Sequence, residues 1–487
     1  MDTGPAQSNS SVITGQPRIP LSLSVLLRPT EWLSHSKLPW LFLLYAVPSV
    51  LFLSIAMPPF QVADELAHAL RANQIATGKI VADRLGGWVH RDLVKFGELY
   101  KPMWFHPEVK QTSDLASRAA AITWSGETQE ENFQNTAQYG PILYLPQAVG
   151  FLLGRLADFS LAQTLLVMRL VNAICACAVG FFALRVCRRA NALMFATLLL
   201  PMTLSQFASA SQDALLISLS LLCVAIASRI LSEGRAARFG EFALFAAIVT
   251  ATTLARPSQL ALAFLSPAFF NWREHRPWAK IAVAVVAVTI IASWMGLLRY
   301  LMPPVPSDWS VSGQLEYILA NPLALPSAVV RSIVTQGWFL LTSLIGRLGW
   351  LDAPMPDWFI ILSCVSLASA LIAPGNRGSA WVPGLVGLTT FGAIVMATGF
   401  ALYLSWTPVA KPTIDGVQGR YILGVLPLLG WAIPSYGARL EKMLMPAWVL
   451  VLAFPLVTIA TLPAVVMERY YGSWQNMAGT VKVLLLP

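Results

Sequence analysis

Charged residues are scarce in this sequence. Only 12% of its 487 residues are Asp, Glu, Lys or Arg, compared with about 25% in soluble domains. Hydrophobic residues make up 56% of the chain, and apolar runs of about 20 residues, long enough to cross a bilayer, recur along it. A segment in lipid must satisfy its own backbone hydrogen bonds, and these runs are continuous rather than alternating, so they predict helices. The expected fold is an all-α polytopic membrane protein.

Cysteine is also rare, and none lies in a long polar loop. The five cysteines occur in apolar segments or at a basic end: Cys175, Cys177, Cys187, Cys223 and Cys364. Cys175 and Cys177 share one apolar run and lack partners for a zinc site, so disulfides and metal thiolates are not expected. Glycine-rich phosphate loops, Ser-His-Asp spacings and dinucleotide-binding fingerprints are absent as well. Motifs therefore assign no cofactor with certainty.

The formal net charge of +9 is distributed as in a membrane protein. Basic residues cluster in short loops between apolar runs: Arg185, Arg188 and Arg189; Arg229, Arg235 and Arg238; Arg273, Arg276 and Lys280. An excess of Lys and Arg in short loops is typical of the cytoplasmic side. This placement favours a multi-pass membrane protein over a partner of nucleic acid.

Eleven spans are expected, and two further segments are ambiguous. The spans are 38–57, 162–184, 190–208, 212–231, 241–255, 258–271, 279–300, 357–373, 383–404, 421–437 and 444–463. Residues 141–156 and 326–348 are apolar enough to enter the membrane. If both crossed it, the count would be thirteen and the middle basic clusters would face outward, against the usual charge rule. We therefore expect both to be interfacial or re-entrant helices.

These spans divide the chain into three regions. Residues 1–37 carry no evident cleavable signal and are expected to form a cytoplasmic tail. The membrane domain covers 38–463, with non-cytoplasmic loops at 58–140, 301–356 and 405–420, and a non-cytoplasmic tail follows at 464–487. The loop 58–140 holds ten of the 24 acidic residues and three of the five histidines. A structureless loop of this length is improbable, so surface helices and a functional role are expected there.

The most distinctive local sequence is PPFQVADELAHALRANQIATGKI, residues 58–80. If it forms a helix, Asp64, His68 and Arg71 lie at i, i+4 and i+7 and share one face, with Glu65 beside them. One interpretation is an ordinary helix cap with weak i, i+4 ion pairs. The other is a catalytic group in which a carboxylate at the membrane edge removes a proton from an acceptor hydroxyl. Composition leaves both open.

Several other charges lie next to apolar segments. Arg256, Arg347, Lys411 and Arg420, followed by Tyr421, all fall on the predicted outer side, where converging cations suit a lipid phosphate. Each could equally be a solvated charge. Asp213 begins a predicted span and could be a helix cap or part of the same site. Arg169 lies inside a span and should pair with an acid or reach toward the interface. Aromatic residues near span ends, Trp350 among them, are better explained as an interfacial belt than as a sugar-binding platform.

The stretch at 58–80 resembles the opening of a family of bacterial membrane proteins catalogued as domain of unknown function 2142 (DUF2142). The resemblance extends over about 40–465 through YGPILYLPQAVGFLLGRL (139–156), RLVN (169–172), SQDALL (211–216), ARPSQLAL (255–262), SLIGRLGWLDAPMP (343–356) and QGRYILGVLPLL (418–429). That family is similar in layout to the GT-C glycosyltransferases, which take a sugar from a polyprenyl-phosphate carrier. The likeness implies Asp64 as general base and Glu65 as its neighbour or a metal ligand. GT-C members differ in their need for a divalent metal, which therefore stays open.

The resulting hypothesis is an inverting transferase that moves a glycosyl group from a polyprenyl-(pyro)phosphate to an envelope acceptor, a glycan or a lipid. Asp64, Glu65 and His68 would form the catalytic group. Arg71, Asp213, Arg256, Arg347, Lys411, Arg420 and Tyr421 would bind substrate. Two alternatives remain: a non-catalytic flippase or polysaccharide exporter for lipid-linked sugars, and a scaffold of an envelope-assembly complex. The exporter hypothesis requires ionisable residues along a path through the spans.

Overall fold

The computed structural model describes residues 1, 37–83, 85–269, 277–301, 310–374, 381–434 and 436–485. The predicted tail, apart from Met1 and Lys37, and the predicted basic loop with Arg273 and Arg276 lie outside these residues. The first half contains α3 (Leu38–Ala56), α4 (Glu65–Ala76), β1 (Gly86–His90), α5 (Arg91–Glu98), η1 (Lys101–Met103), α6 (Ser113–Ala120), β2 (Thr128–Asn132), α7 (Gln134–Ala137), η2 (Ile142–Tyr144), α8 (Leu145–Leu156), α9 (Leu161–Val186), α10 (Asn191–Leu198), α11 (Pro201–Phe207) and α12 (Asp213–Glu233). The second half contains α13 (Phe239–Ala255), η3 (Pro257–Phe269), α14 (Pro277–Leu301), α15 (Val311–Ala320), α16 (Ala324–Ile345), β3 (Arg347–Leu348), β4 (Ala353–Pro354), α17 (Asp357–Ile372), α18 (Trp381–Ser405), η4 (Gly419–Ala432), α19 (Ala438–Leu444), α20 (Ala447–Val466), η5 (Met467–Tyr471) and α21 (Trp474–Leu485).

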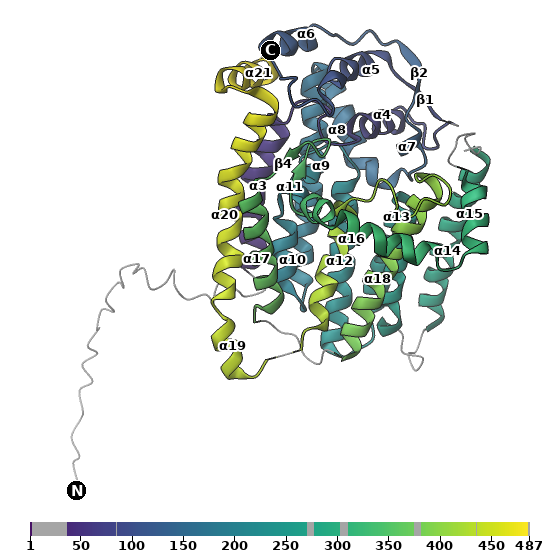
Figure 1. Ribbon diagram of the computed structural model, residues 1–487, viewed down its shortest axis with the longest axis vertical. Coiled ribbons are helices and arrows are strands. Elements are labelled where there is room, and N and C mark those ends of the chain that lie inside the picture. The colour runs from purple at the N-terminus through teal and green to yellow at the C-terminus, as the bar shows by residue number, and fades with distance from the viewer. Residues whose placement is uncertain are drawn as a thin grey trace.

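The long helices form a bundle of membrane-spanning length (Figure 1). Within the described residues, seven helices are long and apolar enough to cross a bilayer: Leu38–Ala56, Leu161–Val186, Asp213–Glu233, Pro277–Leu298, Ala324–Ile345, Trp381–Ser405 and Arg439–Tyr471. Shorter apolar helices occur at Ile142–Leu156, Phe239–Ala255 and Asp357–Ile372. The predicted class, an all-α polytopic membrane protein, is confirmed.

Not every predicted span is one long helix. The segment 190–208 is divided into α10 and α11, because Pro201 has no N–H to donate and Leu200 before it is extended. The predicted spans at 258–271 and 421–437 are the 3-10 helices η3 and η4. The ambiguous segment 326–348 is α16, one of the seven apolar helices of spanning length. It runs across the long helices in Figure 1.

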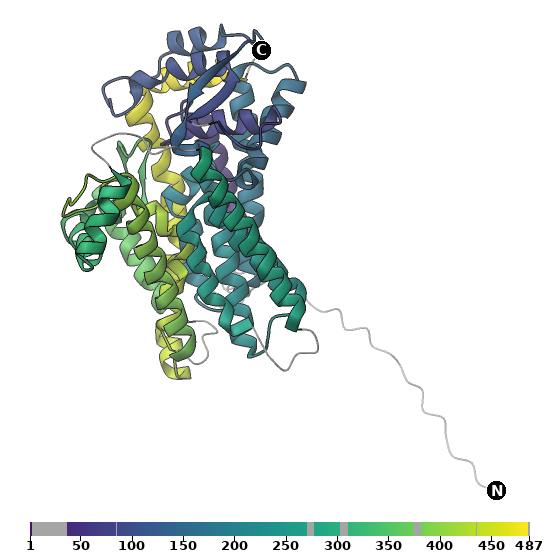
Figure 2. The same cartoon turned by 90° about the vertical axis from the view of Figure 1, so that its right-hand side faces the viewer.

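A polar cap covers one end of the bundle, and we define it as residues 58–140 together with α21. It contains the short helices α4 to α7 and the antiparallel pair β1–β2, whose register runs from Gly86 opposite Asn132 to His90 opposite Thr128. Helix α21 lies against α6, although 354 or more positions separate them in sequence. Figures 1 and 2 both show this cap above the long helices. The expectation that 58–140 carries surface helices is met.

The ends of α3 and α9 show where the first predicted basic cluster lies. Near the start of α3, Trp40 meets Phe181 of α9 with ring centroids 4.9 Å apart. At the other end of α3, next to the cap, the Met57 carbonyl accepts a hydrogen bond from Arg169. The two helices are therefore antiparallel. The last turn of α9, with Arg185, lies at the end of the bundle away from the cap.

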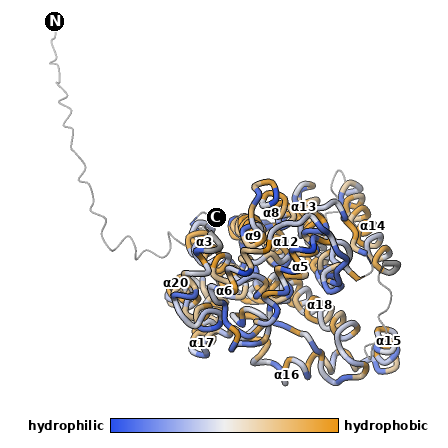
Figure 3. Tube along the Cα trace, turned by 90° about the horizontal axis from the view of Figure 1, so that it is seen from above, coloured by the Kyte–Doolittle hydropathy of each residue, from blue (hydrophilic) through white to orange (hydrophobic). Residues whose placement is uncertain are grey.

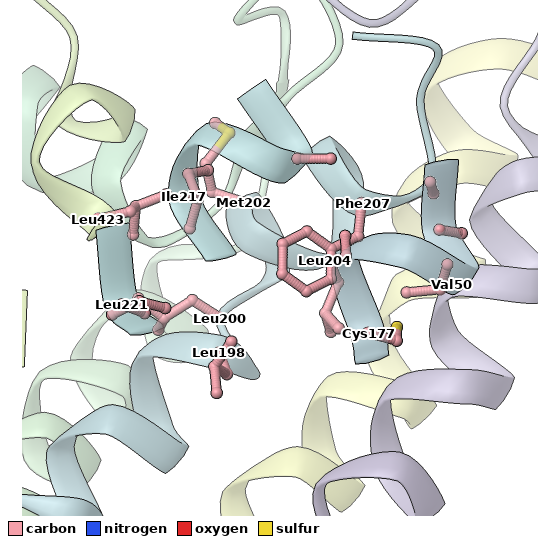
Figure 4. Packing of buried hydrophobic residues seen from close by; sticks show 14 of the residues in the cluster. Val50, Cys177, Leu198, Leu200, Met202, Leu204, Phe207, Ile217, Leu221 and Leu423 are labelled. Carbon is pink, nitrogen blue, oxygen red and sulfur yellow. The ribbon is translucent and has the colours of Figure 1, made fainter. Parts of the chain in front are cut away.

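The core is centred on the break between α10 and α11. Figure 4 shows Leu198 and Leu200 beside Met202 and Leu204, with Ile217 of α12 and Leu423 of η4 in the same cluster. Helix α12 is the most enclosed span, with 72% of its apolar window buried, whereas no residue of the α14 window is buried. Seen from above in Figure 3, α14 lies at the periphery. The first residue of α12, Asp213, lies at the cap end, because it is 3.9 Å from Arg420, which also pairs with Asp64 of the cap.

A buried ion pair joins the cap to the bundle. Glu65 begins α4, and its two oxygens accept from Arg169 of α9, at 2.8 Å from Nε and 2.7 Å from Nη2. The same carboxylate accepts from the backbone N–H groups of Phe60 (3.1 Å) and Ala210 (2.9 Å). Both side chains are almost fully buried. The prediction that Arg169 pairs with an acid is confirmed.

Removing one partner of this pair should destabilise the protein strongly. Glu65→Gln leaves the Arg169 guanidinium buried and uncompensated, which costs about 3–5 kcal/mol. The double variant Glu65→Leu/Arg169→Met removes both charges and should recover much of that loss. Unfolding by SDS titration measures the effect. Glu127→Gln, which breaks an exposed pair with Arg91, should cost less than about 1 kcal/mol. Equal losses for Glu65→Gln and Glu127→Gln would contradict this account of the junction.

Candidate functional site

Asp64 sits at the start of α4, immediately before the buried Glu65. Its backbone is in the left-handed region, with φ of 65°, a conformation that costs a non-glycine residue energy and that recurs at functional sites. One carboxylate oxygen accepts from Asn135 at 3.2 Å and the other from Arg420 at 3.1 Å. The side chain remains 34% exposed. Asp64 is therefore held in place and still accessible.

Asp213, the first residue of α12, is the second carboxylate of the site. It lies 3.0 Å from Nη2 of Arg256, which follows α13, and 3.9 Å from Nη1 of Arg420 in η4. Its side chain is only 5% exposed. The four side chains alternate in charge in the order Asp64, Arg420, Asp213, Arg256, and we call them the ion-pair cluster. Its charges formally balance.

The two arginines of the cluster share an aromatic neighbour. The guanidinium carbon of Arg256 lies 4.5 Å from the ring centroid of Tyr421, and that of Arg420 lies 5.6 Å from it. Both distances are within the range of cation–π attraction. Gly419 makes this arrangement possible, because a side chain there would collide with the backbone of α16 at Leu340. The close approach of η4 to α16 brings Arg420 and Tyr421 to the cluster.

His68 lies behind the cluster, one turn along α4 from Asp64. Its Nδ1 is 2.7 Å from the hydroxyl of Tyr144, and its ring stacks on Tyr139 at a centroid distance of 6.5 Å. Burial lowers the pKa of His68, and the nearby carboxylates of Asp213 and Asp64 oppose that shift. Burial likewise raises the pKa of Tyr139 to about 12. His68 is thus a neutral, hydrogen-bonded ring at neutral pH.

Two residues predicted to belong to the polar group around Asp64 point elsewhere: Arg71, expected on the same face, and Glu65, expected beside it. Glu65 is used entirely in the junction with Arg169 described above. Arg71 is buried, and its guanidinium donates to Gln74 at 2.5 Å and to the Ile80 carbonyl at 2.6 Å. The structure therefore corrects the expectation that Arg71 joins Asp64 and His68 in one polar group, because its donors hold the chain that follows α4.

Two other predicted phosphate ligands make their contacts with residues outside the cluster. Arg347 donates through Nε to the Leu351 carbonyl at 2.7 Å, within the β3–β4 turn. Lys411 pairs with Asp415 at 2.6 Å. Among the predicted substrate-binding residues, the structure brings together Asp213, Arg256, Arg420 and Tyr421, and Arg420 also pairs with Asp64.

Sequence reasoning missed three uncharged members of the site. Asn135 binds Asp64, Tyr144 binds His68, and Tyr139 stacks on the His68 ring. All three lie in 135–144, the end of the cap and the start of the following apolar segment. Their only sequence signal is polar and aromatic residues at the edge of an apolar run, which also describes an interfacial belt.

The cluster has the chemistry of an anion site with an adjacent base. Two guanidinium groups that are mostly buried offer several N–H donors with the geometry preferred by phosphate oxygens. Nε of Arg420 is buried and has no hydrogen-bond partner in the described part of the chain. Among the residues that the structure describes, no group of three or more His, Cys, Asp or Glu side chains is arranged to hold a metal ion.

A small open cavity borders Arg169 and is lined by the end of α3, the start of α9 and part of α6. Ile55, Pro58, Leu165 and Leu166 contribute apolar surface to it, and Arg169 lies at its wall. All three guanidinium nitrogens of Arg169 are already bonded to Glu65 or to carbonyl groups at the end of α3. This cavity therefore has apolar walls but offers no cation with open donors, in contrast to the ion-pair cluster.

Fold and site together define an all-α polytopic membrane protein with charged residues gathered beneath a polar cap. The chain belongs to the DUF2142 family of predicted membrane proteins, whose family model matches residues 41–429. This confirms the family resemblance seen in the sequence, and the matched range includes the whole ion-pair cluster. No curated protein and no solved structure matches the chain.

The lowered pKa of His68 predicts a specific pH dependence of stability. Above the ordinary histidine pKa of about 6.5, the ring is neutral in both the folded and the unfolded state and does not make stability depend on pH. As the pH falls below that value, the unfolded chain gains a proton that the buried ring does not, so the folded state loses stability until its own lowered pKa is passed. His68→Gln should reduce the fall in thermal midpoint between about pH 7 and about pH 5.

Tyr144→Phe is the matched control, because it removes the partner hydroxyl but leaves the titrating ring in place. Its profile should keep the acid-side fall. If the profiles of wild type and His68→Gln run parallel over this interval, His68 does not titrate as described.

Proposed function

We propose that this protein transfers a glycosyl group from a polyprenyl-(pyro)phosphate to an acceptor in the bacterial envelope. The cap would lie on the non-cytoplasmic face of the inner membrane. One observation carries the proposal: Asp64, an accessible carboxylate, is paired with Arg420 beside Arg256 at the end of an apolar bundle. A candidate base and a candidate phosphate-binding pair would thus lie next to each other where the head group of a membrane lipid arrives. The GT-C likeness of the sequence supports the same chemistry.

The members of the ion-pair cluster have different roles in this proposed reaction. Asp64 takes the proton of the acceptor hydroxyl as its oxygen attacks the anomeric carbon from the face opposite the phosphate. The bond from the anomeric carbon to the phosphate oxygen breaks, and its electron pair stays on the leaving phosphate. Arg256 and Arg420 stabilise the negative charge that develops there. The reaction forms a bond between the acceptor oxygen and the anomeric carbon, and the configuration at that carbon is inverted.

Asp213 and Glu65 act by positioning these groups. Asp213 is buried between the two guanidinium groups and holds them side by side, which would otherwise be opposed by their like charge. Glu65, the residue after Asp64, binds Arg169 and so holds this part of the chain against α9. The difference in exposure between Asp64 and Asp213, 34% against 5%, supports Asp64 as the base and Asp213 as the positioning residue.

The exporter alternative gains no specific support. It requires ionisable residues along a path through the spans, and Arg169 is the main candidate in this sequence. Arg169 instead binds Glu65 and carbonyl groups at the cap end of α3. The scaffold alternative differs from a transferase in allowing Asp64 to be replaced freely, and the next experiment separates the two.

Asp64→Asn should abolish transfer while the protein still folds. The amide keeps the shape of the side chain but cannot accept the proton, so turnover should fall by about 10²–10⁴-fold. The assay measures release of polyprenyl phosphate from a panel of polyprenyl-phosphate hexoses, with envelope extract as acceptor. Asp114→Asn, which neutralises an exposed cap carboxylate outside the site, should leave turnover unchanged. Wild-type turnover in Asp64→Asn would remove Asp64 from the chemistry.

The orientation of the cap is tested separately. Ser117→Cys places a thiol on the exposed side of α6 in the cap, and Gly240→Cys places one in the first turn of α13 at the opposite end. A membrane-impermeant maleimide added to intact spheroplasts should label residue 117 but not residue 240. The wild-type protein is the background control, because its cysteines are buried or half-buried in apolar segments. The reverse pattern would place the site in the cytoplasm.

A further inference from the structure

Three aromatic side chains meet on the segments that flank Asp64, and we call them the aromatic ledge. The indoles of Trp104 and Trp350 lie with ring centroids 4.3 Å apart and an interplanar angle of 35°. The ring of Phe105 meets Trp350 edge-on, at 5.3 Å and 62°. Trp104 and Trp350 are half-buried, whereas Phe105 is 62% exposed. The ledge therefore offers an open aromatic surface with fixed support behind it.

The ledge differs from an interfacial belt in how its N–H groups are used. The indole nitrogens of Trp104 and Trp350 both donate to the same carbonyl, that of Phe60, each at 3.1 Å. A tryptophan in a membrane belt directs its polar edge toward water and head groups. Here both polar edges face the protein interior. What remains outside is hydrocarbon and ring surface, so the ledge is suited to contact with C–H groups.

Backbone contacts fix the ledge relative to the candidate base. The N–H of Phe60 donates to Glu65 at 3.1 Å, and the N–H of Ala63 donates to the Gly349 carbonyl at 3.2 Å. Gly349 precedes Trp350, and Ala63 precedes Asp64. The turn that carries Trp350 is thus bonded directly to the chain that carries the base.

A second ion pair stiffens the same region. Arg469 donates through Nη2 to Asp352 and to the Met103 carbonyl, each at 2.6 Å. Met103 precedes Trp104, and Asp352 belongs to the turn of Trp350, so one guanidinium ties the two tryptophan segments together. Both charged side chains are nearly buried.

The backbone of the ledge is strained. Phe60, Phe105 and Leu351 have positive φ values of 61°, 59° and 64°, which are costly for bulky side chains. For Phe105 this strain is not explained by packing, because its ring is mostly exposed. An exposed aromatic ring on a strained backbone is the observation from which we infer a ligand here.

We propose that the aromatic ledge binds the pyranose ring of the acceptor, so that the acceptor is a carbohydrate. This rests on the proposed function and narrows its substrate class. The C–H face of a pyranose packs against Phe105 and the exposed part of Trp350, while its hydroxyl groups remain free to reach water and polar side chains. For this, a sugar stacked on the ledge must present one hydroxyl to Asp64, whose chain segment is bonded to the Trp350 turn through Ala63 and Gly349. A lipid contact of the same rings is the competing outcome.

The test is saturation-transfer NMR on the full-length protein in nanodiscs, with methyl β-D-glucopyranoside and methyl α-D-mannopyranoside as probes. At least one glycoside should receive saturation from the protein, through the C–H face of its ring. Phe105→Ala should weaken that affinity by about five- to tenfold, the usual size of one aromatic contact. Trp350→Phe, which keeps an aromatic ring, should bind more tightly than Trp350→Ala. Trp358→Ala, which removes an exposed tryptophan outside the ledge, should bind as the wild type does.

Asp64→Asn should retain glycoside binding, which separates the two proposals. Loss of transfer with retained binding is the result expected if both hold. A wild-type protein that binds neither glycoside, or a Phe105→Ala variant that binds as well as wild type, overturns the ledge proposal and leaves the role of Asp64 to its own assay.

A direct reporter guards against variants that fail to fold. With 4-fluorophenylalanine at position 105, the fluorine resonance should shift when the glycoside is added and should not be broadened by spin-labelled phospholipid. Broadening by the lipid with no response to the sugar assigns the ring to the membrane and overturns the proposal.

Discussion

The buried pair of Glu65 and Arg169 is the constraint on which the arrangement of the site depends. Two charges in an apolar interior are tolerated only when both are fully bonded, and here the carboxylate also accepts two backbone N–H groups while Arg169 binds three carbonyls at the end of α3. The pair therefore fixes the end of α3, the start of α4 and the middle of α9 as one unit. Asp64 directly precedes Glu65, so its position is fixed by this unit.

The remaining site residues come from places where helices begin or end at the same side of the bundle. Asp213 starts α12, Arg256 follows α13, and Arg420 lies at the start of η4. Helix ends near an interface can carry charge without placing it in hydrocarbon. Gly419 then allows η4 to approach α16 closely enough for Arg420 to reach both carboxylates. The cluster is thus a consequence of packing continuous apolar helices whose polar ends coincide.

The sequence predicted the parts of the molecule that depend on composition. Long apolar runs gave α3, α9, α12, α14, α18 and α20 close to their observed bounds, and the shared sidedness of Asp64, Asp213, Arg256 and Arg420 anticipated their meeting. It could not predict contacts set by tertiary packing. Glu65 was grouped with Asp64 because its partner, Arg169, lies 104 positions away. Arg71 shares a helical face with His68, yet the carbonyl groups after α4 determine where it points. The 3-10 geometry of η3 and η4 also has no clear periodic signal.

The most direct test of the account is a cryo-EM structure of the protein in nanodiscs with a polyprenyl-phosphate hexose. The account predicts the phosphate within hydrogen-bonding distance of Arg256 and Arg420, with the sugar on the Asp64 side. A phosphate bound in the apolar cavity beside Leu165, or at the opposite end of the bundle near Arg188, would contradict it.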